Sequence, residues 1–402
     1  MNILVVHEVS YLKKVVYEYQ DFAERLAARG HRVSVIDYDA TGDGEYGKAE
    51  CSKTGLGRVV LENTPHLNLP FVKYVSGRWN YPKLLEPKLR QGAVDVVLLY
   101  SIFVNGTSTI RLCRKYGVPV VYRVLDIYHK IRGNPLMAVP LYFAERFTYR
   151  NADVVCVTNE KLRGYVERLA GARRLAPVSV IHHGVDLDFF KPLPRDPEFA
   201  ARHGIRPEDR VALFLGTTYT FSGLDRLLAG FAKLRAHWPQ LKIVVVGGGD
   251  LDGKLAAMVA RLGLRHDVIL AGSQPYQEVP RWISLADVAF NSFRVNDVTR
   301  DVIPIKLLQY LACAKPVVCT PMPDVMRLFP ERESGMVYCD IGKTEDYLRL
   351  LARIAFDPGE NQALARDGLA FVTAHFSMQS QIAKLEALLS ETARKRAGAA
   401  PC

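Results

Sequence analysis

The chain alternates short apolar runs with amphipathic helical patterns along nearly its whole length, and this alternation limits its fold more than any other feature. Many of the apolar runs are uninterrupted, as in strands that helices cover on both faces. Strand–helix alternation predicts parallel sheets joined by crossover helices. The predicted strands span 3–6, 33–36, 94–99, 118–122, 154–157 and 179–181, and then 211–215, 242–246, 268–271, 288–291, 316–319 and 335–338.

The two sets of strands predict an α/β protein with two doubly wound, Rossmann-like domains that face a cleft. A chain of 402 residues also exceeds what one hydrophobic core accommodates. Residues 187–209 are rich in proline and charge, as linkers are. We therefore expect an N-terminal domain over 1–185, a C-terminal domain over 186–375, and an amphipathic helix over 376–396 that packs back on the first domain. Residues 41–57 read as a mobile loop.

Composition argues against several classes of protein. No apolar run approaches the ~20 residues that cross a bilayer, and the N-terminus MNILVVHEVS lacks the basic start of a signal peptide. The seven cysteines are odd in number and form no CxxC pair. We therefore expect reduced, mostly buried thiols in the cytosol rather than a disulfide framework or a zinc site.

The positive charge is concentrated in one part of the chain. The formal net charge is +11, and residues 51–150 hold 15 Lys and Arg against 5 Asp and Glu. Such a surplus suits a phosphate-bearing substrate, an anionic membrane surface or a nucleic acid, and it is equally compatible with a solvated basic surface. Segments 75–92 and 133–150 interleave cations with aromatic residues, which suggests contact with an anionic membrane, although 133–150 could instead pack against the core. No nucleic-acid-reading motif accompanies the charge, so we expect no nucleic-acid partner.

The loops that follow the strands are the places to search for a site, because doubly wound sheets bind ligands beyond the carboxyl ends of their strands. The loop after the first strand, HEVSYLKK over 7–14, contains no glycine and argues against NAD or FAD. His7 and Glu8 would stand at the mouth of a cleft, or they would simply be the polar end of a strand.

The loop after the strand at 211–215 offers a phosphate seat at a helix N-terminus. It combines a glycine for close backbone approach, three hydroxyl groups and a second glycine that opens a helix: Gly216, Thr217, Thr218, Ser222 and Gly223. The three glycines at 247–249 fail the GxGxxG spacing, and tight turning explains them adequately.

The segment 301–320, DVIPIKLLQYLACAKPVVCT, predicts a helix that begins at Pro304 and a buried strand beyond it. Lys306 lies in the first turn of this helix, where a cation is unfavourable for the helix dipole. A bound anion would offset that cost, and Arg294 and Arg300 lie close by in the sequence. This is the strongest local indication of a ligand site in the chain.

Several phrases of the sequence resemble the retaining GT-B glycosyltransferases of family 4. FLGTTYTFSGLDRLLAGFAKL resembles the family's strand–loop–helix that faces the donor diphosphate, and KIVVVGGGDLDGKL resembles its next strand and glycine turn. DVILAGSQPYQEVPRWISLADVAFNSF is similar to the segment beside the base, and DVIPIKLLQYLACAKPVV to the donor-site helix. IHHGVDLDFFKP, over 181–192, is similar to the interdomain hinge. The resemblance covers nearly the whole chain and is weakest around 40–92.

The resemblance implies a GT-B fold and transfer of a sugar from a UDP- or GDP-linked donor, with retention, to a glycan or a polyprenyl- or lipid-linked acceptor, without a metal cofactor. It places Asp301 at the sugar, Gln309 at the ribose and Lys306 against the leaving diphosphate. The other implied donor-binding residues are Gly216, Thr217, Thr218, Ser222, Gly223, Gly247, Gln274, Arg300 and Ile303. The acceptor-side candidates for catalysis are His7, Asp126 and His129, of which His129 could equally be a surface or core histidine.

The sequence departs from the family pattern at three places. The family's acidic pair with E-x7-E spacing is replaced by Asp301 and Gln309. Its Arg and Lys diphosphate clamp is replaced by hydroxyl residues, for which Lys306 and Arg300 could compensate. The histidine that often follows the fourth strand is absent, although His129 lies three residues beyond Asp126.

We expect an enzyme of the cytoplasm, peripheral at the inner face of the membrane, in bacterial cell-surface polysaccharide or glycolipid synthesis. Two alternatives remain open. A nucleotide-sugar epimerase of the same fold would act on the donor alone. A non-catalytic partner subunit that binds a nucleotide sugar or glycan is slightly favoured by Gln309.

Overall fold

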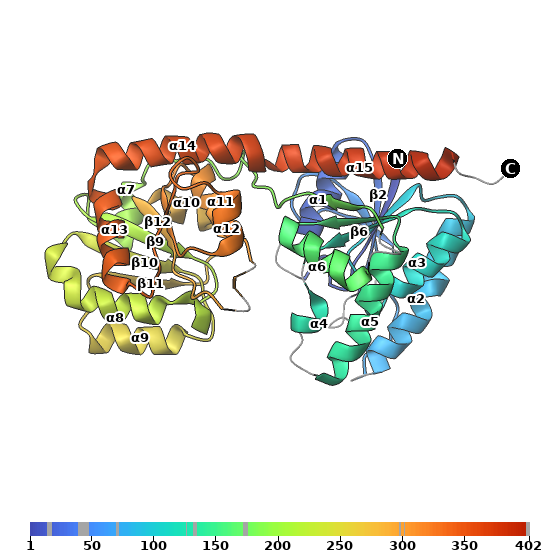
Figure 1. Ribbon diagram of the computed structural model, residues 1–402, viewed down its shortest axis with the longest axis horizontal. Coiled ribbons are helices and arrows are strands. Elements are labelled where there is room, and N and C mark those ends of the chain that lie inside the picture. The colour runs from blue at the N-terminus through green and yellow to red at the C-terminus, as the bar shows by residue number, and fades with distance from the viewer. Residues whose placement is uncertain are drawn as a thin grey trace. The chain divides into compact units, whose positions relative to one another are not determined.

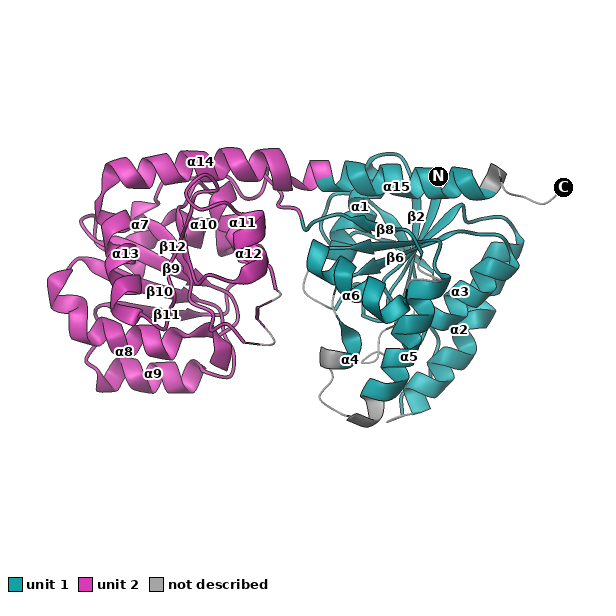
Figure 2. Cartoon of the chain, viewed as in Figure 1, with its two compact units in different colours: residues 1–183, 381–402 teal, residues 184–380 magenta. Residues whose placement is uncertain are grey.

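The computed structural model describes residues 1–13, 18–38, 48–69, 72–125, 127–131, 135–171, 176–296, 299–300 and 302–398. Two of the predicted site residues, Asp126 and Asp301, lie outside these ranges. The chain forms two compact units (Figure 2). Unit 1 comprises Met1–His183 and Gln381–Cys402, and unit 2 comprises Gly184–Ser380.

Unit 1 is built on an eight-stranded sheet in the order β3-β4-β2-β1-β5-β6-β7-β8. Its strands are β1 (Asn2–Val6), β2 (Arg32–Asp37), β3 (Ala49–Cys51), β4 (Val59–Asn63), β5 (Val96–Leu99), β6 (Val120–Val124), β7 (Val154–Val157) and β8 (Val178–Val180). All neighbours pair in parallel except β3 with β4. Helices lie on both sides of the sheet (Figure 1). They are α1 (Glu18–Ala28), α2 (Val72–Arg90), α3 (Gly106–Lys115), α4 (Tyr128–Ile131), α5 (Pro135–Asn151), α6 (Glu160–Ala170) and α15 (Met378–Gly398).

Unit 2 is built on a six-stranded, all-parallel sheet in the order β11-β10-β9-β12-β13-β14. The strands are β9 (Arg210–Leu215), β10 (Leu241–Val246), β11 (Val268–Gly272), β12 (Val288–Asn291), β13 (Val317–Cys319) and β14 (Met336–Tyr338). The helices are α7 (Pro197–Arg202), α8 (Leu224–Leu234), α9 (Asp252–Arg261), α10 (Val279–Ser284), α11 (Ile305–Ala312), α12 (Pro323–Leu328), α13 (Thr344–Phe356) and α14 (Pro358–Phe376), with 3₁₀ turns at η2 (Thr220–Ser222), η3 (Arg235–His237) and η4 (Tyr276–Glu278).

Strand β9 shows why many of the apolar runs in the sequence contain no polar residue. Leu213 and Leu215 pack into one core together with residues of α10, α11 and α14. Ala212 and Phe214, which alternate with them, pack into a second core with residues of α8, α9 and α13. Because both faces of the strand are covered, no position along it favours a polar side chain.

Each of the twelve predicted strands overlaps an observed strand, and the predicted α/β class is confirmed. The prediction missed β3 and β4, and reading 41–57 as a mobile loop was wrong for β3, which pairs with β4. Residues 41–47 of that loop lie outside the described residues.

The predicted helix starting at Phe376 was wrong in its first residues. Phe376 ends α14, and Ser377 is extended, with φ of −61° and ψ of 138°. Val185 pairs with this residue: its N–H donates to the Phe376 carbonyl and its carbonyl accepts from Met378, both at 2.8 Å. The second helix, α15, therefore starts anew at Met378.

Two properties of the described part of the chain bear on its setting. None of the helices described there has both the length and the hydropathy that a bilayer crossing requires. Six of the seven cysteines lie there, all six are free thiols, and four of them are buried: Cys113, Cys156, Cys313 and Cys319.

Candidate functional site

The carboxyl ends of β9 and β12 form the topological switch point of unit 2, because the chain runs from β9 to one side of the sheet and from β12 to the other. Two pairs of loops meet there in direct backbone contact. A Cβ at Gly223 would lie 2.1 Å from the Ser292 carbonyl oxygen, and one at Gly247 would lie 2.0 Å from the Gly216 carbonyl oxygen. Gly247 also has a φ of +136°. Glycine is therefore required where these loops close.

Lys306 extends from the first turn of α11 into this switch point. Its side chain is only 7% exposed, and its Nζ lies 3.7 Å from the ring centroid of Phe214 and 4.2 Å from that of Phe293. The amine has no hydrogen-bond partner among the described residues. Burial lowers the pKa of Lys306 well below its usual value. The amine also lies under the first loop, since a Cβ at Gly216 would be 4.0 Å from Nζ.

Three more buried polar atoms near the carboxyl ends of these strands have no partner among the described residues. They are the Ser222 hydroxyl, the Asn291 amide oxygen and the Thr320 hydroxyl. Buried polar groups without partners are uncommon in folded proteins. Together with Lys306 they give this end of the sheet four buried polar atoms without a partner among the described residues, as is common in binding sites.

Helix α11 is tied to the end of β9 by Tyr310, whose hydroxyl accepts from the Leu215 N–H at 2.6 Å. On the same helix Gln309 is half-buried, and its side-chain amide bonds to no described residue, so it can receive a ligand hydroxyl. Ile303 is half-buried and packs against the unit 2 core. Arg300 is exposed.

The predicted phosphate loop divides into two kinds of residue. Thr217 is exposed, as a residue that meets a ligand would be. Thr218 is buried, and its hydroxyl donates to the Asp252 carboxylate at 2.5 Å, so it joins this loop to the one after β10. Gln274 donates to the Ala271 carbonyl at 2.7 Å and shapes the loop after β11.

The start of α8 carries its own anion, which the sequence analysis missed. Asp225, in the first turn of that helix, pairs with Arg294 at 2.5 Å and with Lys254 at 2.9 Å. Burial alone would raise the pKa of Asp225, but these two cations hold it below its usual value. Arg294 is therefore engaged with α8, whereas the sequence placed it beside the start of α11.

His7 is packed inside unit 1. It is buried at the end of β1, its Nδ1 accepts from the Glu8 N–H at 2.9 Å, and burial lowers its pKa to about 3. Its ring packs against Tyr19 and Tyr100 at centroid distances of 4.5 and 5.5 Å. The neutral, packed imidazole favours the second reading given above, a polar strand end.

Glu8 fills the switch point of unit 1, which lies between β1 and β5. Its carboxylate accepts from the Ser101 hydroxyl at 2.5 Å and from the Asn105 N–H at 3.0 Å, directly before α3. The carboxylate thus satisfies donors at the N-terminal end of α3, where a negative charge is favourable.

His129 lies on α4, after the end of β6, and its Nδ1 lies 2.6 Å from an oxygen of Glu145. Asp126, its predicted companion, falls outside the described residues.

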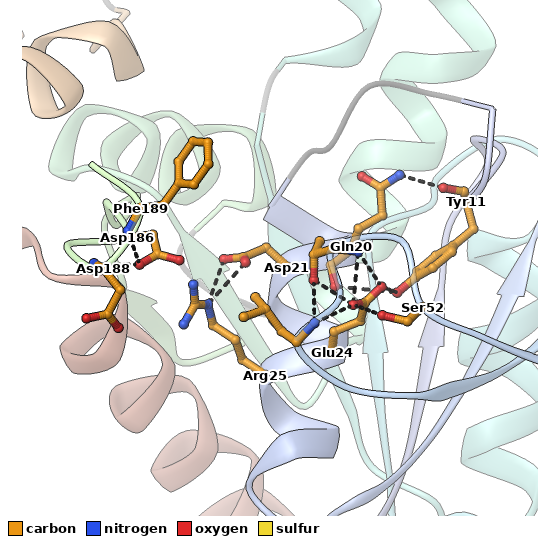
Figure 3. A network of polar contacts seen from close by, with 11 residues as sticks. Tyr11, Gln20, Asp21, Glu24, Arg25, Ser52, Asp186, Asp188 and Phe189 are labelled. Atoms are coloured by element: carbon orange, nitrogen blue, oxygen red, sulfur yellow. Dashed lines mark hydrogen bonds and ion pairs between the residues drawn. The ribbon is translucent and has the colours of Figure 1, made fainter. Parts of the chain in front are cut away.

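A buried carboxylate organises the segment that follows β3. Glu24 on α1 accepts hydrogen bonds from the hydroxyls of Tyr11 at 3.0 Å, Ser52 at 2.6 Å and Thr54 at 2.5 Å (Figure 3). The backbone N–H groups of Lys53, Thr54 and Leu56 point at the same carboxylate. The sequence analysis missed this cluster, because Tyr11 lies 13 residues from Glu24, and Ser52 and Thr54 lie 28 and 30 residues from it.

The two parts of the chain match two family descriptions. Residues 195–394 match "Glycosyl transferases group 1", and residues 19–189 match "Glycosyltransferase Family 4". A mannosyltransferase of Mycolicibacterium smegmatis, GDP-mannose-dependent and acting on phosphatidylinositol monomannoside, is 27% identical over 60% of this chain and 63% of its own length. The D-inositol 3-phosphate glycosyltransferase of Streptomyces bingchenggensis is 27% identical over 45% of this chain and 41% of its own. The chain thus spans less than two thirds of either relative.

Two solved structures share the fold over nearly the whole chain. Sucrose-phosphate synthase from Thermosynechococcus elongatus has a TM-score of 0.74 at 16% identity and covers 97% of this chain and 98% of its own. HepE from Anabaena, in complex with UDP, has a TM-score of 0.73 at 15% identity and covers 97% of this chain and 100% of its own. With both units matched in sequence and in fold, the chain belongs to the group 1, family 4 glycosyltransferases of the GT-B fold.

Proposed function

We propose that the protein transfers a sugar from a nucleoside-diphosphate donor to a hydroxyl acceptor, with retention of the anomeric configuration. Lys306 is the observation that carries this proposal. An amine that is buried with no anionic partner among the described residues, at the switch point of a doubly wound sheet, is suited to a ligand that brings negative charge. Family membership identifies the class of that ligand as a nucleotide sugar.

The residues of unit 2 divide the work of such a transfer. The bond between the anomeric carbon and the diphosphate oxygen breaks, the acceptor oxygen takes its place, and the acceptor proton leaves with the diphosphate. Negative charge grows on the leaving diphosphate, and Lys306 with the loop at Gly216 and Thr217 stabilises it. Gln309 accepts a ribose hydroxyl, and Asp301 is assigned to the sugar by the family pattern alone.

The donor is proposed to be UDP- or GDP-linked, since the relatives named above use GDP-mannose or bind UDP. We propose that transfer needs no metal, so EDTA should leave the rate unchanged. No three His, Cys, Asp or Glu side chains in the described ranges gather closely enough to hold a metal ion.

A donor screen tests the proposal. Thermal shift with UDP, GDP, UDP-glucose and GDP-mannose should show stabilisation by one nucleotide family, because a ligand that binds only the folded state raises its stability. Lys306→Met should lower the affinity for that nucleotide at least tenfold, as expected when roughly 1.4 kcal/mol or more of binding free energy is lost. Lys233→Ala, at an exposed site on α8, is the matched control and should bind as the wild type does. Equal affinity in the Lys306 variant would contradict the role of the amine.

The comparisons do not favour the two alternatives. An epimerase would convert the donor sugar without an acceptor, and a partner subunit would bind the donor without consuming it. Incubation of the purified protein with the identified donor, with and without an acceptor mixture, separates the three by product analysis.

We also propose that unit 1 rests on an anionic membrane that carries the acceptor, in the cytoplasm. Helix α2 exposes Val72, Val75 and Trp79, at i, i+3 and i+7, so that they form one stripe. Trp79 is 73% exposed, and Lys73 and Lys83 flank the stripe. Exposed apolar residues with cations beside them are typical of helices that lie at a membrane surface.

Flotation with phosphatidylcholine vesicles, with and without phosphatidylglycerol, tests this part. The wild type should float only with the anionic vesicles, and Val75→Ser with Trp79→Ser should abolish flotation. Met326→Ser, at an exposed apolar site in unit 2, is the control. A wild type that stays in the bottom fraction with both kinds of vesicle would contradict membrane contact.

A further inference from the structure

His129 and Glu145 form an imidazole–carboxylate pair at the carboxyl edge of the unit 1 sheet. His129 lies just beyond β6, and Glu145 reaches it from α5. Besides the 2.6 Å contact at Nδ1, the backbone N–H of His129 donates to the other carboxylate oxygen at 3.4 Å. The Glu145 side chain is 0% exposed, while that of His129 is 17% exposed. The carboxylate therefore lies behind the ring, on the protein side.

Two tyrosines fix the imidazole from its sides. Tyr165 stacks on the ring at a centroid distance of 6.2 Å, and its hydroxyl donates to Glu145 at 3.3 Å. Tyr142 meets the ring edge-on at 5.5 Å. Burial raises the pKa of the Glu145 carboxyl, while the bonds from His129 act in the opposite direction. A carboxylate held in this way is placed to accept a hydrogen bond from the imidazole nitrogen that faces it, which is Nδ1.

The donors around Glu145 favour one placement of the imidazole hydrogen. An ionised carboxylate accepts hydrogen bonds and donates none, so in the neutral imidazole Nδ1 carries the hydrogen and Nε2 carries the lone pair. Every contact that the structure gives to the two ring nitrogens involves Nδ1, and within the described ranges Nε2 has no hydrogen-bond partner. The pair thus holds Nε2 of His129 in place as a hydrogen-bond acceptor on its outer side.

We propose that His129 and Glu145 form a subsite for a sugar hydroxyl of the acceptor, in which Nε2 of His129 accepts the hydroxyl hydrogen bond and Glu145 is the positioning residue. This inference rests on the proposed function, to which it adds the acceptor side. A lone pair backed by a carboxylate selects a hydroxyl over a phosphate oxygen, which has no hydrogen to give. The exposed ring of Tyr142 meets the imidazole, and the exposed ring of Phe143 lies 5.5 Å from that of Tyr142. The two rings offer the apolar surface on which sugar rings pack.

Nitrogen NMR on histidine-labelled protein tests the pair directly. The His129 resonances are assigned by their loss in His129→Gln. We expect a protonated Nδ1 and an unprotonated Nε2, and a shift of the Nε2 resonance on titration with methyl α-D-mannopyranoside or methyl α-D-glucopyranoside up to roughly 100 mM. A hydrogen on Nε2, or no response to either sugar, would overturn the proposal.

Variants separate positioning from a structural role. Glu145→Gln and His129→Gln should each lower about fivefold the affinity for the sugar that responds, because each loses one hydrogen bond. The double variant should bind that sugar no more weakly than either single variant does. Glu86→Gln makes the same change at an exposed pair with Lys115 and should have no effect. Additive losses in the double variant would contradict action through His129.

Donor binding distinguishes this inference from the proposed function. Both variants should bind the nucleotide found in the donor screen as tightly as the wild type, because that site lies in unit 2. If the wild type binds no nucleotide, the proposed function is contradicted, and the sugar titration alone then tests the subsite. Loss of nucleotide binding in Glu145→Gln alone would indicate misfolding, in which case Glu145→Asp, which keeps the carboxylate, is titrated instead and decides by its response.

Discussion

The Glu18 carboxylate receives two hydrogen bonds from the buried guanidinium of Arg123, from Nε at 2.7 Å and from Nη2 at 2.8 Å. The third nitrogen of Arg123 donates to the carbonyls of Ile181 at 2.6 Å and Val157 at 3.1 Å. His183, the last residue of unit 1 before Gly184, contacts the same carboxylate at 2.8 Å. One ion pair thus joins α1, β6, β7 and the segment that leads out of unit 1.

Loss of one member of this pair should be far more costly than loss of both. Arg123→Ala removes the guanidinium and leaves the buried carboxylate in contact with His183, and it should lower the free energy of unfolding by about 3–5 kcal/mol. Arg123→Leu combined with Glu18→Leu removes both charges and should cost much less. Urea unfolding of the three proteins checks the order, and a double variant as unstable as Arg123→Ala would contradict it.

The same pair should make stability depend on acid. Burial alone would raise the pKa of Glu18, but the charge and hydrogen bonds of Arg123 outweigh it and hold that pKa at about 2, below the 4.5 of a free carboxyl. The stabilisation is complete above pH 4.5 and is lost as the pH falls toward 2, which amounts to about 3 kcal/mol. Unfolding free energies measured across this range should fall less steeply in Glu18→Gln than in the wild type.

Nucleotide binding should take up a proton at Lys306. Burial lowers the pKa of this amine, and a diphosphate close to it favours the charged form and raises the pKa again. Between the two values binding brings a proton with it, so affinity falls as the pH rises. Calorimetry of UDP or GDP in buffers of different ionisation enthalpy measures the uptake. Lys306→Met should remove it, and an uptake that persists in this variant would assign the proton to another group.

Two glycine-to-alanine changes should change the stability of the protein in opposite directions. Gly247→Ala puts a Cβ 2.0 Å from the Gly216 carbonyl oxygen at a φ of +136°, so it should cost more than about 2 kcal/mol of stability and disrupt nucleotide binding. Gly253→Ala, in helix α9, meets nothing within 4 Å and should stabilise by up to about 1 kcal/mol. Thermal unfolding of both variants checks the signs.

Glu24→Gln should loosen the segment after β3 without affecting unit 2. Lys53 and Thr54 donate backbone N–H groups to one carboxylate oxygen, and Thr54 and Leu56 to the other, and these groups cannot act as acceptors. An amide nitrogen at either position therefore loses at least one of these bonds, at a cost of about 1–3 kcal/mol. Hydrogen exchange at the Lys53, Thr54 and Leu56 amides should accelerate, and nucleotide affinity should stay unchanged. Exchange at the wild-type rate would show that the carboxylate is dispensable.

Local pattern was sufficient to predict twelve of the fourteen strands in the described part of the chain, and the two-unit, doubly wound class. It failed for β3, whose sequence AEC contains no apolar run and which is identified only by its pairing with β4. It also failed for β4, whose three apolar residues are followed by Glu62 and Asn63. It also ran one helix through Ser377, since the pairing with Val185 that interrupts the helix is distant in sequence.

The sequence drew attention to Lys306, because a cation in the first turn of a helix needs an explanation. Its burial between Phe214 and Phe293 could not be read from the chain. The sequence analysis named Arg294 and His129 but not their partners Asp225 and Glu145. The reason is the same, because each pair joins residues from different elements. The roles assigned to the donor-site residues stay predictions until nucleotide binding is measured.

The return of the chain to unit 1 has a consequence for how the protein is made. Residues after Gln381 complete unit 1, where Glu386 on α15 pairs with Arg29 and His31 at 2.6 and 2.8 Å and Leu385 and Leu389 are buried. On the ribosome these residues emerge only after the whole of unit 2, whose own segment is continuous. Unit 1 therefore cannot reach its final structure until these residues have been made, so the first unit of the chain to be started is not finished before unit 2 has been synthesised.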